Sequence, residues 1–293
     1  MTFSNFVMTV LTGLTTAMLL FLVASGLTLI FGSLKILNFA HGVFYMLGAF
    51  FCYEVVSSFA NSNVGFWVAL AVAPLGVAIV GGLLEAFVIR RVYAREHIDQ
   101  LLLTYALVLI IADVARFVWD VEYKSMTRPP ALSGSVTVFG TSLATYYVLI
   151  LILAPAIALG LYLMLQRTKI GWMIRAATHN REMASALGIN VPRLFLLLFM
   201  LGSWLGGLGG ALYAPLGSIV YYMHTQVLME CFLVMVIGGV GSFWGAFVGA
   251  ILFGLLNSFG FQYFPQASMF FAFVLMAVIL VIRPWGLLGH PER

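Results

Sequence analysis

The chain has 293 residues and a net charge of +4, and 63% of its residues are hydrophobic while only 8% are charged. Because soluble domains carry about 25% charged residues, this composition excludes a soluble globular protein. Apolar runs of about twenty residues recur along the chain, and each can cross a hydrocarbon layer of about 30 Å as a helix. Continuous runs also exclude a transmembrane β-barrel, whose strands alternate in polarity.

We therefore expect an all-α polytopic integral membrane protein with about eight or nine transmembrane segments, some of them broken or re-entrant. The stretches between the segments are too short for a soluble domain, so we expect residues 1–293 to form a single transmembrane domain. The candidate segments are residues 6–32, 38–59, 65–89, 99–119, 143–165, 193–214, 226–242, 244–262 and 266–282.

The basic residues predict the orientation. Arg90, Arg91 and Arg95 share one loop, and a second basic loop spans about residues 166–192. By the positive-inside rule both loops are cytoplasmic. The N-terminus and residues 120–142 are then outside, and the tail from Arg283 is inside. The positive charge therefore indicates membrane topology, and we expect no nucleic-acid partner.

Polar residues cluster between the first two segments, in the stretch LKILNFAHG at residues 34–42. Asn38 and His41 can satisfy backbone groups freed by a helix break or line a hydrated path, and Gly42 allows close approach. A short cytoplasmic turn that begins at Lys35 and is capped by Asn38 explains the same spacing. The spacing leaves both interpretations open.

Charged residues inside the apolar runs each cost about 2.5 to 3.5 kcal/mol at a helix centre. We expect pairing or an interfacial position for them, and no transport chemistry. The expected arrangement pairs Asp113 with Arg116 and Glu85 with Arg90, and it places Glu54 and Glu230 toward the outer ends of their segments.

The loop at residues 166–192 is polar, with apolar residues at spacings that suit short helices on the membrane face. Gly188 is expected to end a helix and Pro192 to begin the next one. A helix resting on lipid headgroups and a docking helix for a cytoplasmic partner fit this loop equally well.

Two ladders of glycine at spacings of four predict faces where helices approach closely. The ladders are Gly202, Gly206 and Gly210, and Gly241, Gly245 and Gly249. We expect static packing inside the bundle ahead of a moving or subunit-contacting surface. In GGVGS at residues 238–242, Gly239 and Gly241 mark either a tight turn or a re-entrant break.

Motifs for nucleotide and metal chemistry are missing from the sequence. It has no G-x-x-x-x-G-K-[ST], so we expect no P-loop, and it has no H-E-x-x-H zinc motif. We expect no catalytic residues, no metal site and no cofactor in this chain. An ion-coupled secondary transporter, which would need a buried carboxylate or ion site at a helix break, stays an alternative, as does a membrane-embedded enzyme.

Four segments follow one another in a characteristic order: GLTLIFGSLKILNFAHGVFYMLGAF (26–50), RAATHNREMASALGINV (175–191), VMVIGGVGSFWGAFVGAILFG (234–254) and RPWGLLG (283–289). Together they resemble the H-type permease subunit of bacterial branched-chain amino acid ABC importers, the hydrophobic amino acid uptake family, over nearly the whole chain. The resemblance implies one permease domain that translocates branched-chain or other neutral amino acids. Amides and urea are alternative substrates, because similar relatives carry them.

The resemblance also implies roles for residues in the loop. It resembles the E-A-A loop of bacterial ABC permeases, which contacts the ATPase, although Met183 replaces the second alanine. Docking is therefore the favoured role of this loop. The implied ATPase-coupling residues are Arg175, Arg181, Glu182, Ala184 and Gly188, and the implied substrate pathway includes Asn38, His41, Gly42, Gly239 and Gly241.

The partners implied by the resemblance are a second homologous permease subunit, two cytoplasmic ATP-binding subunits that hold ATP and magnesium, and a periplasmic substrate-binding protein. Together with the lipid bilayer they place the chain in the bacterial cytoplasmic, or inner, membrane. ATP hydrolysis then belongs to the partner chains, so this chain is expected to act as a transport subunit and not as an enzyme.

Overall fold

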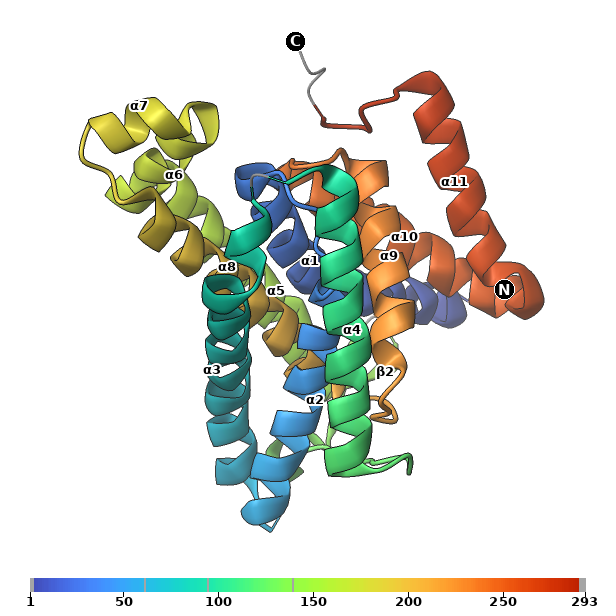
Figure 1. The fold of residues 1–293 in the computed structure, drawn as a ribbon. Coiled ribbons are helices and arrows are strands. Elements are labelled where there is room, and N and C mark those ends of the chain that lie inside the picture. The colour runs from blue at the N-terminus through green and yellow to red at the C-terminus, as the bar shows by residue number, and fades with distance from the viewer. Residues whose placement is uncertain (1–2, 61, 94, 139, 290–293) are drawn as a thin grey trace.

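The computed structural model describes residues 3–60, 62–93, 95–138 and 140–289, and helices account for most of them (Figure 1). Nine helices occupy the nine predicted segments, which confirms the all-α membrane fold. Their bounds are α1 Phe3–Leu34, α2 His41–Ser58, α3 Asn63–Phe87, α4 His97–Trp119, α5 Thr145–Arg167, α8 Val191–Tyr213, α9 Met223–Gly238, α10 Phe243–Tyr263 and α11 Ser268–Ile282. Within the described residues, α1, α3, α4, α5, α8 and α10 are long and apolar enough to span a membrane.

Seven short elements join these helices. They are η1 Ile89–Val92, η2 Pro130–Leu132, β1 Ser135–Val138, β2 Thr141–Ala144, α6 Lys169–His179, α7 Arg181–Ala186 and η3 Pro265–Ala267. The pair of helices α6 and α7 confirms the short helices predicted for residues 166–192. The hairpin of β1 and β2 was not predicted from the sequence.

The helices α2, α9 and α11 are short, with 18, 16 and 15 residues. At 1.5 Å per residue they measure about 27, 24 and 22 Å, which is less than the hydrocarbon thickness of about 30 Å. The helix ends differ from the approximate predicted segments by up to four residues; α2 begins at His41 and not at residue 38, because a turn occupies residues 35–40.

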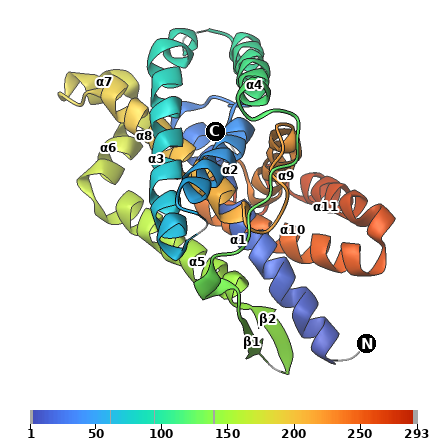
Figure 2. The ribbon, with the colours of Figure 1, turned by 90° about the horizontal axis from the view of Figure 1, so that it is seen from below.

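The two ends of the bundle differ. α6 and α7 lie at one end, at the top of Figure 1, together with the C-terminal segment; this is called the α6–α7 end. The antiparallel strands β1 and β2 directly precede α5, whose other end leads into α6, and they lie beside the start of α1 in Figure 2. The end of α5 that follows the strands is called the hairpin end. There the Oγ atom of Ser4 lies 3.0 Å from Oγ1 of Thr141. Of the tail expected inside, residues 290–293 lie outside the described residues.

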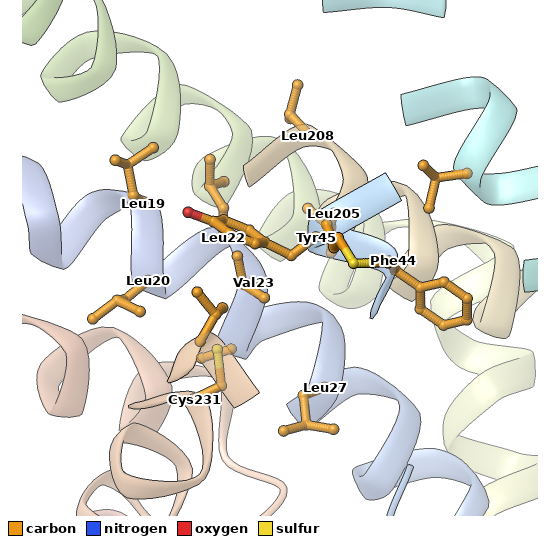
Figure 3. Close-up of a cluster of buried hydrophobic side chains, with 14 of the residues drawn as sticks. Leu19, Leu20, Leu22, Val23, Leu27, Phe44, Tyr45, Leu205, Leu208 and Cys231 are labelled. Atoms are coloured by element: carbon orange, nitrogen blue, oxygen red, sulfur yellow. The ribbon is translucent and has the colours of Figure 1, made fainter. Parts of the chain in front are cut away.

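The centre of the bundle is formed by α1 and α8. α1 packs along α10 and α8, and α8 packs along α2 and α3. Figure 3 shows the apolar side chains of α1 from Leu19 to Leu27 among residues of α2, α8 and α9. α4 and α11 lie at the periphery, each with few neighbours.

The outward faces of α3 and α4 are apolar. Their exposed side chains recur at helical spacing and include Val72, Leu75, Ile79 and Leu83 on α3 and Leu102, Leu109, Ile110 and Phe117 on α4. Soluble monomers rarely expose continuous apolar patches of this kind. These faces therefore suit contact with lipid.

The glycine ladders lie where backbones approach each other. A Cβ atom added at Gly202 would lie 3.0 Å from the carbonyl oxygen of Gly26 in α1, and one added at Gly210 would overlap the carbonyl oxygen of Tyr45 in α2. In the second ladder, a Cβ at Gly249 would lie 2.5 Å from the carbonyl oxygen of Val234 in α9. The first ladder and, in the second, Gly245 and Gly249 therefore pack against helices of the same chain. Gly241 lies in the turn before α10 with a φ of +80°, so the predicted helical ladder is wrong at that residue.

Candidate functional site

The turn between α1 and α2 is closed by hydrogen bonds of its own residues. Lys35 ends α1 with a φ of +60°, and its N–H donates to the carbonyl oxygen of Phe31 at 2.8 Å. The side-chain oxygen of Asn38 accepts from the N–H of Ala40 at 3.1 Å. This is the geometry of an Asx turn, so the turn interpretation of residues 34–42 describes the backbone that the structure shows.

Asn38 and His41 are fully buried behind this turn. The Nε2 atom of His41 lies 2.8 Å from the carbonyl oxygen of Val23 in α1. Among the described residues, Nδ2 of Asn38 and Nδ1 of His41 have no hydrogen-bond partner. A Cβ atom at Gly42 would lie 2.5 Å from the carbonyl oxygen of His224, so α2 touches α9 there. Asn38, His41 and Gly42 line neither the cavity beside Arg175 nor the one beside Glu230, and their role in the pathway stays a prediction.

α7 is short, and hydrogen bonds cap both of its ends. The side chain of Asn180 accepts from the N–H of Met183 at 2.9 Å and caps the first turn. At the other end Gly188 has a φ of +85°, and the N–H of Ile189 donates to the carbonyl oxygen of Ala184 at 3.1 Å. This is a Schellman cap, whose positive φ favours glycine. The predicted helix end at Gly188 is confirmed, and α8 begins at Val191, next to Pro192, as expected.

Arg181 connects α7 to the membrane helices. Its guanidinium donates to the carbonyl oxygen of Leu34, the last residue of α1, at 2.9 Å. The same guanidinium lies 4.9 Å from the ring centroid of Phe195 in α8. One side chain thus links the α6–α7 end to the two central helices of the bundle.

The outer surface of α6 and α7 exposes large apolar side chains beside charged ones. Trp172 is 67% exposed, Met183 is 59% exposed and Leu187 is 75% exposed. Glu182, in the first turn of α7, is also exposed, whereas Ala184 of the same helix is buried. Arg175 donates to the carbonyl oxygen of Leu165 and so holds α6 against the end of α5. The exposed residues Trp172, Met183 and Leu187 are called the apolar surface of α6–α7.

The stretch GGVGS forms a tight turn between α9 and α10. Gly239 has a φ of +110°, and the N–H of Ser242 donates to its carbonyl oxygen at 3.0 Å. The C-terminal segment covers this turn, because the N–H of Leu287 donates to Ile237 at 3.0 Å and that of Leu288 to Gly238 at 2.8 Å. Freed carbonyl groups of α9 are therefore satisfied by RPWGLLG, the last of the four segments singled out in the sequence.

A cavity of about 510 Å³ opens at the α6–α7 end and is called the inner cavity. It lies between the last turns of α1, the helix α6 and the start of α10. Two of the predicted site residues meet here, since Arg175 and Gly241 both line it, together with Lys35 and His179. Arg181 lies beside the same end of α1, so the predicted coupling and pathway residues adjoin each other.

A second cavity, of about 230 Å³, lies nearer the hairpin end and is called the outer cavity. The first half of α1 and the helix α9 form most of it, and Val23, whose carbonyl oxygen contacts His41, is part of its wall. Glu230 of α9 lines this cavity and is only 8% exposed. The expected interfacial position of Glu230 is wrong, because α9 carries it into the bundle.

Of the two ion pairs predicted for the apolar runs, the structure contains one. Glu85 accepts from Arg90 at 2.7 Å and 3.1 Å, which confirms the predicted pair, and it also accepts from the hydroxyl of Tyr93 at 2.8 Å. The bonds to Glu85 raise the pKa of Arg90 above its ordinary value, and burial raises the pKa of Tyr93. The predicted pair of Asp113 and Arg116 is wrong, since they form no ion pair among the described residues. The Arg116 guanidinium lies instead 5.9 Å from the centroid of the Tyr221 ring.

The family model described as branched-chain amino acid transport system / permease component matches residues 9–282. The high-affinity branched-chain amino acid transport system permease protein LivH of Salmonella typhimurium is 26% identical over 300 residues, covering 99% of this chain and 97% of the relative.

Two other relatives match over similar lengths. The protein BraD of Pseudomonas aeruginosa, a permease protein of a system with the same description, is 27% identical over 293 residues, covering 96% of this chain and 94% of the relative. The permease protein LivM of Salmonella typhimurium is 23% identical over 300 residues, covering 94% of this chain and 68% of the relative. No solved structure shows a significant match.

Proposed function

The chain belongs to the family of permease components of branched-chain amino acid transport systems, and from this premise we propose that it is one membrane subunit of an ATP-driven importer of branched-chain or other neutral amino acids. The proposal of ATP as the energy source rests on α6 and α7. These helices expose an apolar surface at one end of the bundle, and Arg181 of α7 donates a hydrogen bond to the end of α1. A chain without a P-loop needs such a contact to receive energy from ATP.

The partners follow from the same proposal. Two cytoplasmic subunits bind ATP with magnesium, and one of them docks on the apolar surface of α6–α7, where Trp172, Met183 and Leu187 offer apolar area beside the charge of Glu182. A second, homologous permease chain completes the membrane path, and a periplasmic binding protein delivers the substrate at the hairpin end. Similarity to both LivH and LivM of one organism supports a pair of related permease chains.

The same arrangement sets the orientation. The chain lies in the bacterial inner membrane with the α6–α7 end in the cytoplasm and the hairpin end outside. The basic residues of η1 and α6, together with those that flank them, then face the cytoplasm, in keeping with the positive-inside rule.

Closure of the two ATP-binding subunits moves α6 and α7, and Arg181 passes that movement to Leu34 of α1. α1 lines the outer cavity with its first half and the inner cavity with its last turns. A shift of this one helix against α9 and α10 therefore opens one cavity while it closes the other. The glycine contacts between α1, α8 and α10 allow backbones to slide at close range.

The test is purification of the chain in mild detergent from cells that also produce its partner subunits. Leu187→Ser removes an exposed apolar contact, and we expect at least tenfold less of the ATP-binding subunits to co-purify. Val136→Ser, an exposed apolar residue on β1 at the hairpin end, is the matched control and retains them. Recovery of an active transporter that contains no ATP-binding subunit would contradict the proposal.

A further inference from the structure

The outer cavity has one wall that consists of hydrogen-bond acceptors. Thr12 and Thr15 line it from α1, and their hydroxyls donate to the carbonyl oxygens of Met8 and Leu11 at 2.8 Å and 2.9 Å. A hydroxyl whose hydrogen is used in this way presents only lone pairs to a ligand. These two threonines therefore accept hydrogen bonds from whatever occupies the cavity.

Glu230 faces the same cavity from α9. Among the described residues its only hydrogen-bond donor is Gln226, at 2.9 Å from Oε1, and none of the described Lys, Arg or His side chains forms an ion pair with it. A buried carboxylate is costly unless it is paired with donors or a cation. The carboxylate and the threonine lone pairs together suit a small cationic group with several N–H donors.

The remaining wall has a different chemistry. Tyr45 and Tyr213 line the cavity with their ring centroids 5.7 Å apart, and neither hydroxyl donates a hydrogen bond among the described residues. Figure 3 shows Tyr45 reaching from α2 across α1, with its hydroxyl on the side of Leu19. Leu19, Leu20 and Val23 add an apolar lining. Free hydroxyl donors beside an apolar surface suit an anionic group attached to an aliphatic chain.

We infer that the outer cavity is a transit site for a zwitterionic aliphatic amino acid: Glu230 and the threonines hold its α-ammonium group, Tyr45 and Tyr213 donate to its α-carboxylate, and the leucines contact its side chain. A volume of about 230 Å³ is just below the range of about 300 to 1,000 Å³ typical of ligand pockets, which suits a small solute. The inference deepens the proposed function and rests on it. A site of this kind would also favour amino acids over urea and amides, because urea and amides lack the ammonium group that would pair with Glu230.

The direct test is binding of radiolabelled leucine to the complete complex in lipid nanodiscs, in the absence of the binding protein. Two competitors test the charged groups of leucine separately. They are 3-methylbutylamine, which is leucine without its carboxylate, and 4-methylpentanoate, which is leucine without its ammonium group. We expect the amine to compete and the acid to compete at least tenfold less well. Equal competition by the acid would overturn the assignment of Glu230.

Variants test the same contact from the protein side. Glu230→Gln keeps the size of the side chain and the bond to Gln226, and we expect at least tenfold weaker leucine binding, because the charge-assisted bond is lost. Glu54→Gln is the matched control, since Glu54 accepts from Trp119 at 2.8 Å outside the cavity, and it should bind leucine as the original protein does. If Glu230→Gln fails to assemble, Thr12→Val, which removes one acceptor, should weaken binding about fivefold.

The outcomes distinguish this inference from the function on which it rests. ATP-driven uptake by the unaltered complex is measured with the binding protein on the same preparation. Normal leucine uptake together with unchanged binding by Glu230→Gln would overturn the transit site and leave the importer intact. Failure of the unaltered complex to take up any amino acid would overturn both. Binding of sodium in place of leucine, lost in Glu230→Gln, would overturn the inference and identify a cation site.

Discussion

Replacing Arg181 by alanine tests the connection between the ATP-binding partners and the membrane helices. The substitution removes the bond to the carbonyl oxygen of Leu34 and the contact with the Phe195 ring. A hydrogen bond from a charged donor contributes about 1.5 to 3 kcal/mol, and a cation–π contact at a partly exposed site about 0.5 to 1 kcal/mol. Together they amount to about 2 to 3 kcal/mol after allowance for solvent, which corresponds to a shift of roughly 30- to 150-fold in a conformational equilibrium.

The assay compares leucine uptake with ATP hydrolysis in proteoliposomes that contain the complete importer. We expect Arg181→Ala to keep its ATP-binding subunits and its hydrolysis while uptake per ATP falls at least tenfold. Arg181→Lys keeps the charge but loses the planar guanidinium. Its uptake per ATP should lie between that of the original protein and that of Arg181→Ala. Arg193→Ala, a nearby basic residue whose side chain has no hydrogen bond among the described residues, should be normal. Unchanged uptake per ATP in Arg181→Ala would refute the proposed transmission through α1.

Three further substitutions test the packing that supports this connection. Gly188→Ala forces a side chain into a φ of +85° at a cost of about 1 kcal/mol, and we expect retention of the ATP-binding subunits to fall about fivefold in a pull-down. Gly210→Ala places a Cβ atom on the carbonyl oxygen of Tyr45, so we expect no monodisperse protein in size-exclusion chromatography. Gly160→Ala, with nothing within 4 Å, is the control for both and should behave normally. Glu85→Ala leaves Arg90 and the Tyr93 hydroxyl without their acceptor, and a loss of about 2 to 4 kcal/mol should lower the thermal unfolding temperature in detergent; an unchanged temperature would show that the cluster contributes nothing.

The sequence predicts the helices of this fold well, for a physical reason. Each helix in a membrane satisfies its own backbone groups, so apolar length alone locates it. The end of α7 at Gly188 was equally predictable, because a positive φ favours glycine. The hairpin of β1 and β2 was missed since it is short and lies in a polar connection, where neither apolar length nor helical periodicity gives a signal.

The site is less predictable because cavities form between helices that are distant in sequence. The run around Glu230 shows a carboxylate in an apolar helix, but it does not show that α9 turns this carboxylate toward Thr12 and Thr15 of α1. The charge in the middle of an apolar run marked Glu230 in the sequence, but this signal is the same for an interfacial carboxylate and for one that faces the inside of the bundle. Asn38 and His41 show the converse, since polar residues that stood out in the sequence are buried in a turn and its packing.

In the proposed importer this chain conducts its substrate only when partner subunits hydrolyse ATP against the α6–α7 end. The measurement that tests it most directly is uphill accumulation of leucine in proteoliposomes, with the chain alone and with the complete set of partner subunits, with ATP accessible to the ATP-binding subunits. We expect accumulation only with all subunits and ATP present. Accumulation by the chain alone, driven by a sodium or proton gradient, would contradict it.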